Sequence, residues 1–339
     1  MTLTSGGLRR YVEQLSLALA REFPEDIYTL LSDQPFTLPA AAPPNLTALT
    51  RHDKRYWSWG IRRALRDLKS DVFHGTNFEV PYLGGTPSIL TIHDLSPWKN
   101  PEWHGAAERV RQRTPWLIRL RRARLILTVS EAIAREIASH FGVPAENVRV
   151  VPLAPLPSPS SATTKSARPP YFLFVGTLEP RKNLPLLLEA WRSIRRDFPV
   201  DLILAGRTRA DFVPFPQSEG LIMIGEVLDD DLPGLYSNAL AFVYPSLYEG
   251  FGLPVLEAMQ YGCPVIASRD PAVMEVAGGA AIHVGSAAAL AEAMRAVISN
   301  GDLREKLSSN GHARARLFSW QRTARQTHEI YHELVRPIA

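Results

Sequence analysis

Residues 241–260, AFVYPSLYEGFGLPVLEAMQ, join a short apolar run to an amphipathic segment through a loop that contains glycine. The pattern predicts a strand and then a helix that begins near Leu253. Gly250 and Gly252, on either side of Phe251, allow backbone N–H groups to approach an anion, and the first turn of a helix adds its dipole and unpaired N–H donors. The segment therefore predicts a seat for a diphosphate, although such a turn also serves elsewhere as a plain connection.

The same alternation of short apolar runs and amphipathic segments continues along the chain and is typical of repeated βα units with a parallel sheet. Residues 155–170, PLPSPSSATTKSARPP, have little to bury and predict a linker between two halves. The sequence thus predicts an α/β protein with two doubly wound, Rossmann-like domains. The expected strands are 27–31, 71–74, 88–92, 125–129 and 148–151 in the first half, and 171–175, 201–205, 221–224, 241–244 and 264–267 in the second.

The composition is that of a globular protein, because 45% of the 339 residues are apolar and 21% are charged. No apolar run is long enough to predict a membrane span, and the N-terminus lacks the basic and apolar regions of a secretory signal. The single cysteine, Cys263, agrees with a reducing compartment. These features favour a cytoplasmic protein.

The net charge is +4, and the positive excess lies in two stretches of the first half that also contain tryptophan. Basic helices with aromatic residues suit the surface of an anionic membrane, so peripheral association with the inner face of the cell membrane is expected; a solvated helix face is the alternative. A nucleic-acid partner is not expected, because the glycine and carboxylate loop would then have no task. The stretches contain Arg51, Lys54, Arg55, Arg62, Arg63, Arg66 and Lys69 near Tyr56, Trp57 and Trp59, and Arg109, Arg111, Arg113, Arg119, Arg121, Arg122 and Arg124 near Trp116.

Two cations and two carboxylates accompany the predicted strand-to-helix turns of the second half. Arg181 and Lys182 follow a predicted strand and Gly176, where they are suited to neutralising a diphosphate; an exposed pair at a helix start is the alternative. Glu249 and Glu257 flank the glycine loop at two distances, so they are candidates for binding the hydroxyls of a sugar and of a ribose. A solvated helix carboxylate is the alternative for Glu257.

Three further candidates come from the ends of predicted strands. His93 follows the apolar run 88–92 and is expected at the carboxyl end of a strand, where ligands gather in such sheets, or else as the cap of the next turn. Val227 and Leu228 follow the run 221–224 and either line a nucleotide base or belong to the core.

Glu249 and Glu257, within EGFGLPVLEAMQYGCPVIAS at 249–268, resemble the signature of the retaining glycosyltransferases of family 4, which have the GT-B fold. Other segments resemble that family in the same order along nearly the whole chain: ILTVSEAIAREI at 126–137, VVPLAP at 150–155, VGTLEPRKNLPLLLEAW at 175–191 and FSWQRTARQTHEIY at 318–331. The subgroup that the chain resembles most is bacterial and mannosyltransferase-like.

The resemblance implies a domain order and a reaction. The domains are an acceptor-side domain over 1–155, a linker over 156–170, a domain for the nucleotide sugar over 171–316, and a helix over 317–339 that crosses back to the first domain. The reaction is transfer of a hexose, with mannose favoured, from a nucleotide-diphosphate sugar, with GDP-mannose favoured, to a glycan or lipid-linked acceptor in surface polysaccharide synthesis. A nucleotide-sugar-binding remnant without transfer and a GT-B-fold sugar-nucleotide epimerase are the alternatives.

The resemblance also assigns roles. Lys182 takes the position of the family's diphosphate lysine, whereas Thr177 replaces the usual arginine, which suggests Arg181 as the second cation. Glu249 would bind the transferred sugar, Glu257 the ribose, and His93 the sugar near its reacting carbon.

The family's glycine loop, which faces the donor phosphate and the acceptor, is matched by Gly6 and Gly7. Family members begin with a buried strand that feeds this loop, and only Met1–Thr4 precede Ser5 here, so a start codon assigned too late or a degenerate copy is expected. The first strand lies in the middle of a doubly wound sheet, and its loss would leave backbone groups of its neighbours unpaired.

No cofactor and no metal are expected beyond the donor substrate. The first half lacks an Asp-x-Asp motif at a strand end, and residues 229–231 are interpreted as acids that cap a helix. Retention is expected through front-face displacement, in which the leaving phosphate helps to deprotonate the acceptor hydroxyl.

Overall fold

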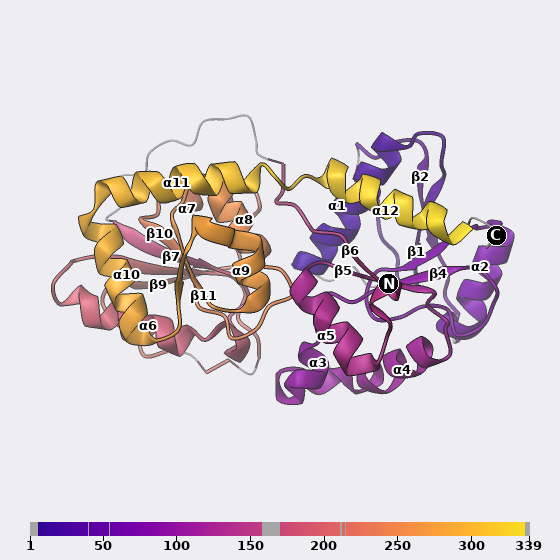
Figure 1. Ribbon diagram of the computed structural model, residues 1–339, viewed down its shortest axis with the longest axis horizontal. Coiled ribbons are helices and arrows are strands. Elements are labelled where there is room, and N and C mark those ends of the chain that lie inside the picture. Colours follow the sequence, from indigo (N-terminus) through magenta and orange to yellow (C-terminus); the bar gives the residue numbers. More distant parts are fainter. Residues whose placement is uncertain are drawn as a thin grey trace. The chain divides into compact units, whose positions relative to one another are not determined.

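The computed structural model describes residues 6–39, 41–53, 55–157, 170–210, 212–213 and 215–335, and the chain divides into two compact units. Unit 1 comprises Met1–Leu153 and Ser319–Ala339, and unit 2 comprises Ala154–Phe318. Each unit has parallel β-sheet and flanking helices, as the alternating pattern predicted (Figure 1). Most of the expected linker, residues 158–169, lies outside the described residues.

Unit 2 is built on a six-stranded parallel sheet in the order β12-β11-β10-β7-β8-β9. The chain runs outward from β7 through β8 to β9, then returns to the other side of β7 with β10 and runs outward again. The strand order therefore reverses between β7 and β10, the point at which doubly wound sheets bind ligands beyond the carboxyl ends of their strands. The strands are β7 Tyr171–Val175, β8 Asp201–Ala205, β9 Leu221–Gly225, β10 Ala241–Tyr244, β11 Val265–Ser268 and β12 Ile282–Val284.

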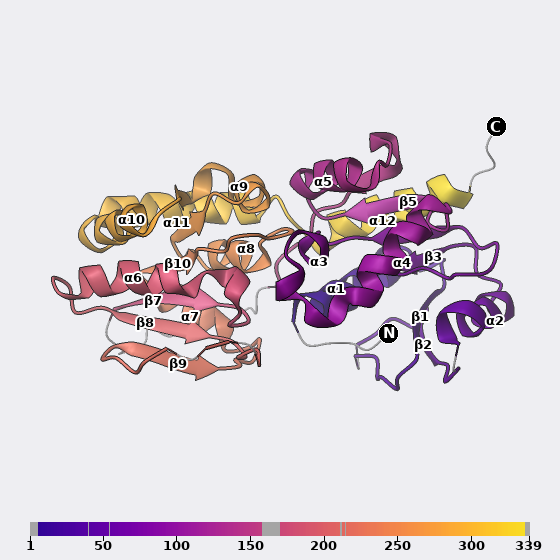
Figure 2. The same cartoon turned by 90° about the horizontal axis from the view of Figure 1, so that it is seen from below.

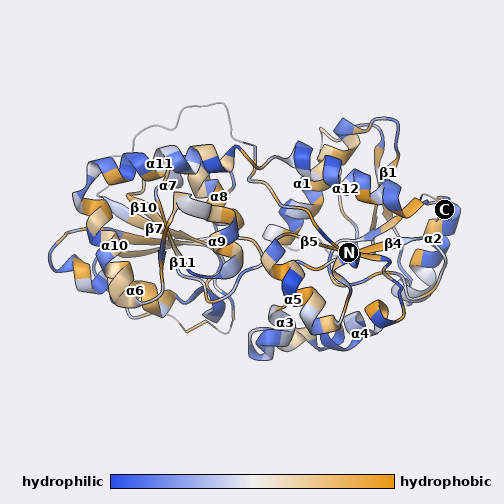
Figure 3. Cartoon of the chain, in the orientation of Figure 1, coloured by the Kyte–Doolittle hydropathy of each residue, from blue (hydrophilic) through white to orange (hydrophobic). Residues whose placement is uncertain are grey.

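Helices cover the unit 2 sheet in packed pairs, α6 with α10 and α8 with α11 (Figures 1 and 2). The hydrophobic colour of Figure 3 lies mainly on the central strands, whereas α11 is largely hydrophilic. Phe172, Phe174 and Phe242 on the strands and Trp191 on α6 are fully buried, which explains why continuous apolar runs form this sheet. The helices are α6 Leu184–Arg195, α7 Leu232–Asn238, α8 Leu253–Gln260, α9 Pro271–Ala277, α10 Ala287–Ser299 and α11 Gly301–Ala315.

Two local expectations for unit 2 need correction. The helix expected from Asn183 begins at Leu184, because Asn183 takes a left-handed conformation (φ +52°) after a 3-10 turn over Pro180–Lys182. Asp231 occupies the N-cap position of α7 but its side chain makes no capping hydrogen bond, so the capping role expected for residues 229–231 is wrong for that side chain.

Unit 1 contains the first five α-helices and the last one. Helix α12 packs along α1, and its Ile330 and Leu334 join Ile89, Leu125 and Leu127 of the strands in one apolar cluster. The C-terminal segment is therefore part of the core of unit 1. The helices are α1 Gly7–Glu22, α2 Ile61–Asp67, α3 Ser96–Lys99, α4 Glu108–Arg119, α5 Glu131–Phe141 and α12 Trp320–Val335.

The described strands of unit 1 form two separate parallel sheets, β1-β2 and β3-β4-β5-β6. Strands β1 and β3 both line a cavity of about 940 Å³, together with apolar side chains of α1 such as Val12 and Leu15. A doubly wound sheet has its first strand between two such halves. The sequence analysis expected the first strand to be lost because only Met1–Thr4 precede Ser5. These residues lie outside the described part of the chain, so the structure does not test that expectation. The strands are β1 Tyr28–Ser32, β2 Leu46–Thr50, β3 Phe73–Gly75, β4 Ser88–Thr91, β5 Leu125–Thr128 and β6 Val148–Val150.

Candidate active site

The loops after β7 and β8 approach each other closely at the carboxyl end of the unit 2 sheet. Gly176 follows β7, and its carbonyl oxygen would lie 1.9 Å from a Cβ added at Gly206, the residue after β8. Both glycines have positive φ, +152° and +143°. Only glycine at 206 permits this approach, and the sequence analysis did not single it out, although it follows an apolar strand as Gly176 does.

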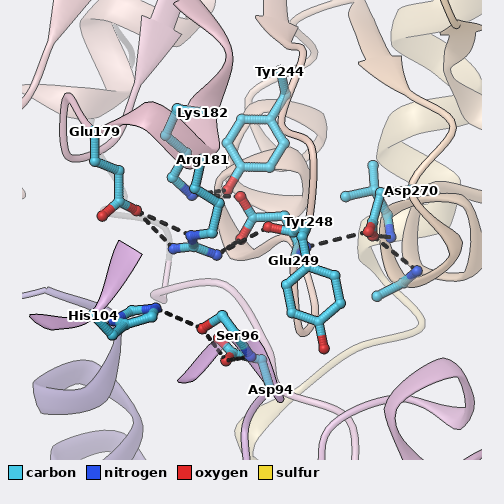
Figure 4. A network of polar contacts seen from close by, with 12 residues as sticks. Asp94, Ser96, His104, Glu179, Arg181, Lys182, Tyr244, Tyr248, Glu249 and Asp270 are labelled. Carbon is cyan, nitrogen blue, oxygen red and sulfur yellow. Dashed lines mark hydrogen bonds and ion pairs between the residues drawn. The ribbon is translucent and has the colours of Figure 1, made fainter. Parts of the chain in front are cut away.

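The 3-10 turn Pro180–Lys182 presents both predicted cations toward the loop after β10. The backbone N–H of Leu247 donates to the carbonyl of Arg181 at 2.9 Å, which ties the two loops together. Lys182 Nζ donates to the Tyr244 hydroxyl at 2.9 Å and to Glu249 Oε1, while Arg181 Nη1 donates to Glu249 Oε2 at 2.9 Å (Figure 4). Lys182 and Glu249 are both 6% exposed, so the alternative of an exposed pair at a helix start is wrong for Lys182.

The charge network extends to two residues that the sequence analysis did not identify. Glu179 Oε1 accepts hydrogen bonds from Arg181 Nε and Nη2 at 3.1 and 2.9 Å, and Glu179 Oε2 accepts from Arg209 Nη1 at 2.8 Å. Three cations, Arg181, Lys182 and Arg209, therefore gather around Glu179 and Glu249 at the switch point of the sheet. Lysine and arginine side chains gathered in this way are suited to binding an anion.

Burial and charge act in opposite directions on this network. Burial raises the pKa of Glu249, but Arg181 and Lys182 outweigh it and lower the pKa overall to about 2. Burial and the neighbouring Arg181 lower the pKa of Lys182, and Glu249 opposes them. Glu249 is therefore held as a carboxylate by the same cations that were expected to bind a diphosphate.

The glycine loop leads directly into α8. Gly252 is the N-cap residue with φ +106° and offers no side-chain cap, and Leu253 is the first residue of the helix. The backbone N–H of Glu249 donates to Asp270. Burial raises the pKa of Asp270 to about 6, although hydrogen bonds from three backbone N–H groups act to lower it. Gly250 is buried, and the Phe251 side chain packs edge-on against Phe318 with ring centroids 6.0 Å apart. The Phe251 ring thus belongs to the core of unit 2, and its backbone is what the loop presents.

The exposure of two other residues excludes one of the alternatives left open for each. Glu257 is 3% exposed and accepts a hydrogen bond from the Tyr236 hydroxyl at 3.2 Å, so it is not a solvated helix carboxylate. Leu228 is 73% exposed and is not a core residue, and Val227 beside it is half-buried. Thr177, after Gly176, is also half-buried.

In unit 1, His93 lies just past the carboxyl end of β4 as expected. Its Nε2–H donates to the carbonyl of Thr76 at 3.0 Å, and its ring lies edge-on to Tyr11 with centroids 4.7 Å apart. Burial lowers the pKa of His93, which favours the neutral ring with Nδ1 as its acceptor. Asp94 accepts hydrogen bonds from the backbone N–H and the hydroxyl of Ser96, so it fixes the start of α3 (Figure 4).

The predicted glycine loop of unit 1 opens its first helix. Gly6 is the N-cap of α1 with φ +93°, and Gly7 is the first helical residue. A Cβ at either position would meet no atom within 4 Å. The positive φ at Gly6 is therefore the local reason for glycine there.

The two halves of the chain match two family models. Residues 5–155 match "Glycosyltransferase Family 4" and residues 160–314 match "Glycosyl transferases group 1". O-antigen chain mannosyltransferase B of Escherichia coli is 37% identical over 79% of this chain and 76% of that protein. The chain belongs to glycosyltransferase family 4.

A second relative in sequence and two solved structures with the same fold also match this family 4 enzyme. O-antigen chain mannosyltransferase RfbU of Salmonella typhimurium is 30% identical over 68% of this chain and 64% of that protein. In fold, the chain is similar to Anabaena Alr3699/HepE, solved in complex with UDP-glucose (TM-score 0.75, 18% identity, 98% of each chain), and to WaaG, a glycosyltransferase of lipopolysaccharide biosynthesis (TM-score 0.71, 15% identity, 96% of each chain). The predicted GT-B fold and the predicted enzyme class, a hexosyltransferase, are confirmed.

Proposed function

We propose that this family 4 glycosyltransferase moves mannose, with retention, from GDP-mannose to a glycan or lipid-linked acceptor in surface polysaccharide synthesis. The observation that carries the proposal is the buried network of Arg181, Lys182 and Glu249 at the switch point of the unit 2 sheet. The mannosyltransferase names of the relatives at 30% and 37% identity support the choice of sugar.

The network suggests how a donor is received. A diphosphate that binds Arg181 and Lys182 competes with Glu249 for the same N–H donors. The Glu249 oxygens that it releases become acceptors for hydroxyls of the transferred sugar, while Gly176, Thr177 and the backbone of 250–253 border the phosphates. Glu257 is proposed to bind the ribose, and Val227 and Leu228 to line the base.

The reaction needs no carboxylate nucleophile in this proposal. The bond between the anomeric carbon and the diphosphate oxygen breaks, and the charge that grows on the diphosphate is stabilised by Arg181 and Lys182. The leaving phosphate accepts the proton of the acceptor hydroxyl, whose oxygen bonds to the same face of the sugar. His93 is proposed to hydrogen-bond the sugar, and Gly6 and Gly7 to serve the acceptor side. Transfer that stops when a chelator is added, at a temperature where calorimetry shows the chelator-treated chain to be folded, would contradict this metal-independent route.

A membrane-facing patch is proposed for unit 1, at the cytoplasmic face of the membrane. Each helix in the described part of the chain is too short or too polar to cross a bilayer. The two basic stretches meet at Tyr82, which stacks on Trp57, lies edge-on to Trp116 and accepts a hydrogen bond from Arg113 at 2.6 Å. We call these four residues with Trp59 the Tyr82 patch; Trp59 and Trp116 are 41% and 49% exposed. Lys54 of the first stretch lies outside the described residues.

The experiment that tests the function is a donor panel on the purified protein. Thermal shifts with GDP, UDP, GDP-mannose and UDP-hexoses identify the donor, and released nucleoside diphosphate with a mannosylated acceptor, of α configuration by NMR, identifies retaining transfer. An altered nucleotide sugar without an acceptor would indicate an epimerase instead. Binding without any turnover would indicate a donor-binding remnant.

A further inference from the structure

Helix α12 carries two histidines on one face, in the sequence THEIYHE at 327–333. His328 and His332 are four residues apart, so their side chains lie one above the other on the helix. A His-Glu-x-x-His spacing on a helix is that of many zinc sites, but the motif alone is weak evidence. The sequence analysis assigned this segment only to the last helix and did not single out its histidines.

The structure adds a carboxylate to this pair from the turn between α1 and β1. Asp26 Oδ2 lies 2.8 Å from His328 Nε2, and His328 Nε2 lies 3.2 Å from His332 Nε2. The three ligand atoms all lie within 4.8 Å of one another. All three residues belong to unit 1, so the cluster is separate from the donor network of unit 2.

The three ligand atoms can share either a proton or a cation. A proton on His328 Nε2 can be shared between Asp26 Oδ2 and the lone pair of His332 Nε2. A cation at the centre instead takes lone pairs from both imidazole nitrogens and from the carboxylate oxygen, which are ligand types that zinc binds.

The spacing also suits zinc. With Zn–N and Zn–O bonds of about 2.0–2.1 Å in tetrahedral geometry, neighbouring ligand atoms are roughly 3.3 Å apart. The observed separations of 2.8 and 3.2 Å are close to this value. The His332 side chain is exposed, so core packing does not fix its rotamer.

Neighbouring groups hold two of the ligands in place. The His328 ring stacks on Phe23 with an interplanar angle of 7°, and the Tyr28 hydroxyl donates to Asp26 Oδ2 at 3.1 Å. Such contacts around a ligand set orient the ligands and strengthen binding. The cluster borders the 940 Å³ cavity of unit 1, so a fourth position remains open to water.

We propose that His328, His332 and Asp26 bind one Zn²⁺, with water as the fourth ligand, and that the ion fastens α12 to the turn before β1. Arg325 and Glu22 make an ion pair at 2.7 Å that joins α12 to the last residue of α1, four residues before Asp26. Because Ile330 and Leu334 of α12 lie in the core of unit 1, the ion stabilises the unit as a whole.

The test is a Zn²⁺ titration of the chelator-treated full-length chain by calorimetry, with Co²⁺ absorption as a spectroscopic readout of a nitrogen and oxygen ligand set. We expect one Zn²⁺ per chain and a rise in Tm. His332→Ala and Asp26→Asn should each weaken Zn²⁺ binding at least about tenfold, because replacing even an outer partner of a metal ligand costs about 10–100-fold in affinity, and should abolish the rise in Tm. His332 is exposed, so its replacement leaves the fold intact.

His52→Ala removes an exposed histidine elsewhere in unit 1 and is the matched control; it should bind Zn²⁺ as the wild type does. Equal binding by wild type and His332→Ala, or no binding by either, would overturn the proposal. Donor binding by unit 2, measured as a thermal shift with GDP, should not change in His332→Ala. A failure of the zinc proposal is therefore distinguishable from a failure of the proposed function.

Discussion

Replacing Glu249 with glutamine is expected to destabilise unit 2 without weakening its affinity for a nucleoside diphosphate. Both carboxylate oxygens of Glu249 accept hydrogen bonds from buried cations, one from Lys182 and one from Arg181. The substitution keeps the shape of the side chain but leaves those cations next to each other without their shared counter-charge. A bound diphosphate restores the missing negative charge.

The magnitude follows from the pKa of Glu249, which falls from 4.5 to about 2 in the folded protein. At about 1.4 kcal/mol per unit, the shift corresponds to roughly 3 kcal/mol of stability. Removal of one partner from a buried ion pair costs about 3–5 kcal/mol, which is the same range. Since about 1 kcal/mol changes Tm by about 2–4 °C in a domain of this size, we expect a decrease of roughly 6–12 °C.

Scanning calorimetry at pH 7, with and without GDP, measures both effects. Glu189→Gln on the exposed face of α6 is the matched control and should melt as the wild type does. Because the folded pKa of Glu249 lies below the unfolded one, its stabilisation is complete above pH 4.5 and is lost as the pH falls toward 2. This part of the acid sensitivity should be absent from Glu249→Gln. The reasoning is refuted if the variant and the control melt together, or if GDP shifts the variant less than the wild type.

Two further predictions concern unit 1. Burial and His93 lower the pKa of His74 from 6.5 to about 3. The stabilisation from the neutral His74 is therefore present above pH 6.5 and is lost as the pH falls toward 3. Between pH 8 and pH 4, the midpoint of urea unfolding should fall less in His74→Asn than in the wild type. Trp116→Ser should reduce co-sedimentation with phosphatidylglycerol vesicles, whereas Met274→Ser, at an exposed apolar residue outside the Tyr82 patch, should not; equal losses would contradict the patch.

The fold could be predicted from the sequence because most strands are short buried runs. Where that signal weakens, the prediction fails. Strand β2, LTALT, is exposed at two of its five positions, and β12 has only three residues, one of them His283. Neither was predicted, because their pairing with β1 and β11, rather than their own apolar content, makes them strands.

The site was predictable in its positions and not in its pairings. Gly176, Lys182 and Glu249 were proposed because they follow predicted strands, and the structure brings Lys182 and Glu249 together, since the carboxyl ends of parallel strands meet at one edge. The contact between Lys182 and Glu249 spans 67 residues. It exists because β7 and β10 are neighbours, and that adjacency follows from the strand order and not from any local pattern.

The pairing changes the interpretation of Glu249. From its position alone, a carboxylate beside a phosphate seat is a sugar ligand, and its negative charge opposes binding of the diphosphate. Within the network Glu249 has a second task. Burial and the neighbouring Arg181 lower the pKa of Lys182, and Glu249 opposes this effect by supplying negative charge. We propose that Glu249 keeps both cations charged and oriented until a diphosphate takes its place. In the proposed function, the carboxylate that stabilises the donor-free site would be released toward the sugar only when the phosphates are bound, which would couple donor recognition to the assembly of the sugar site.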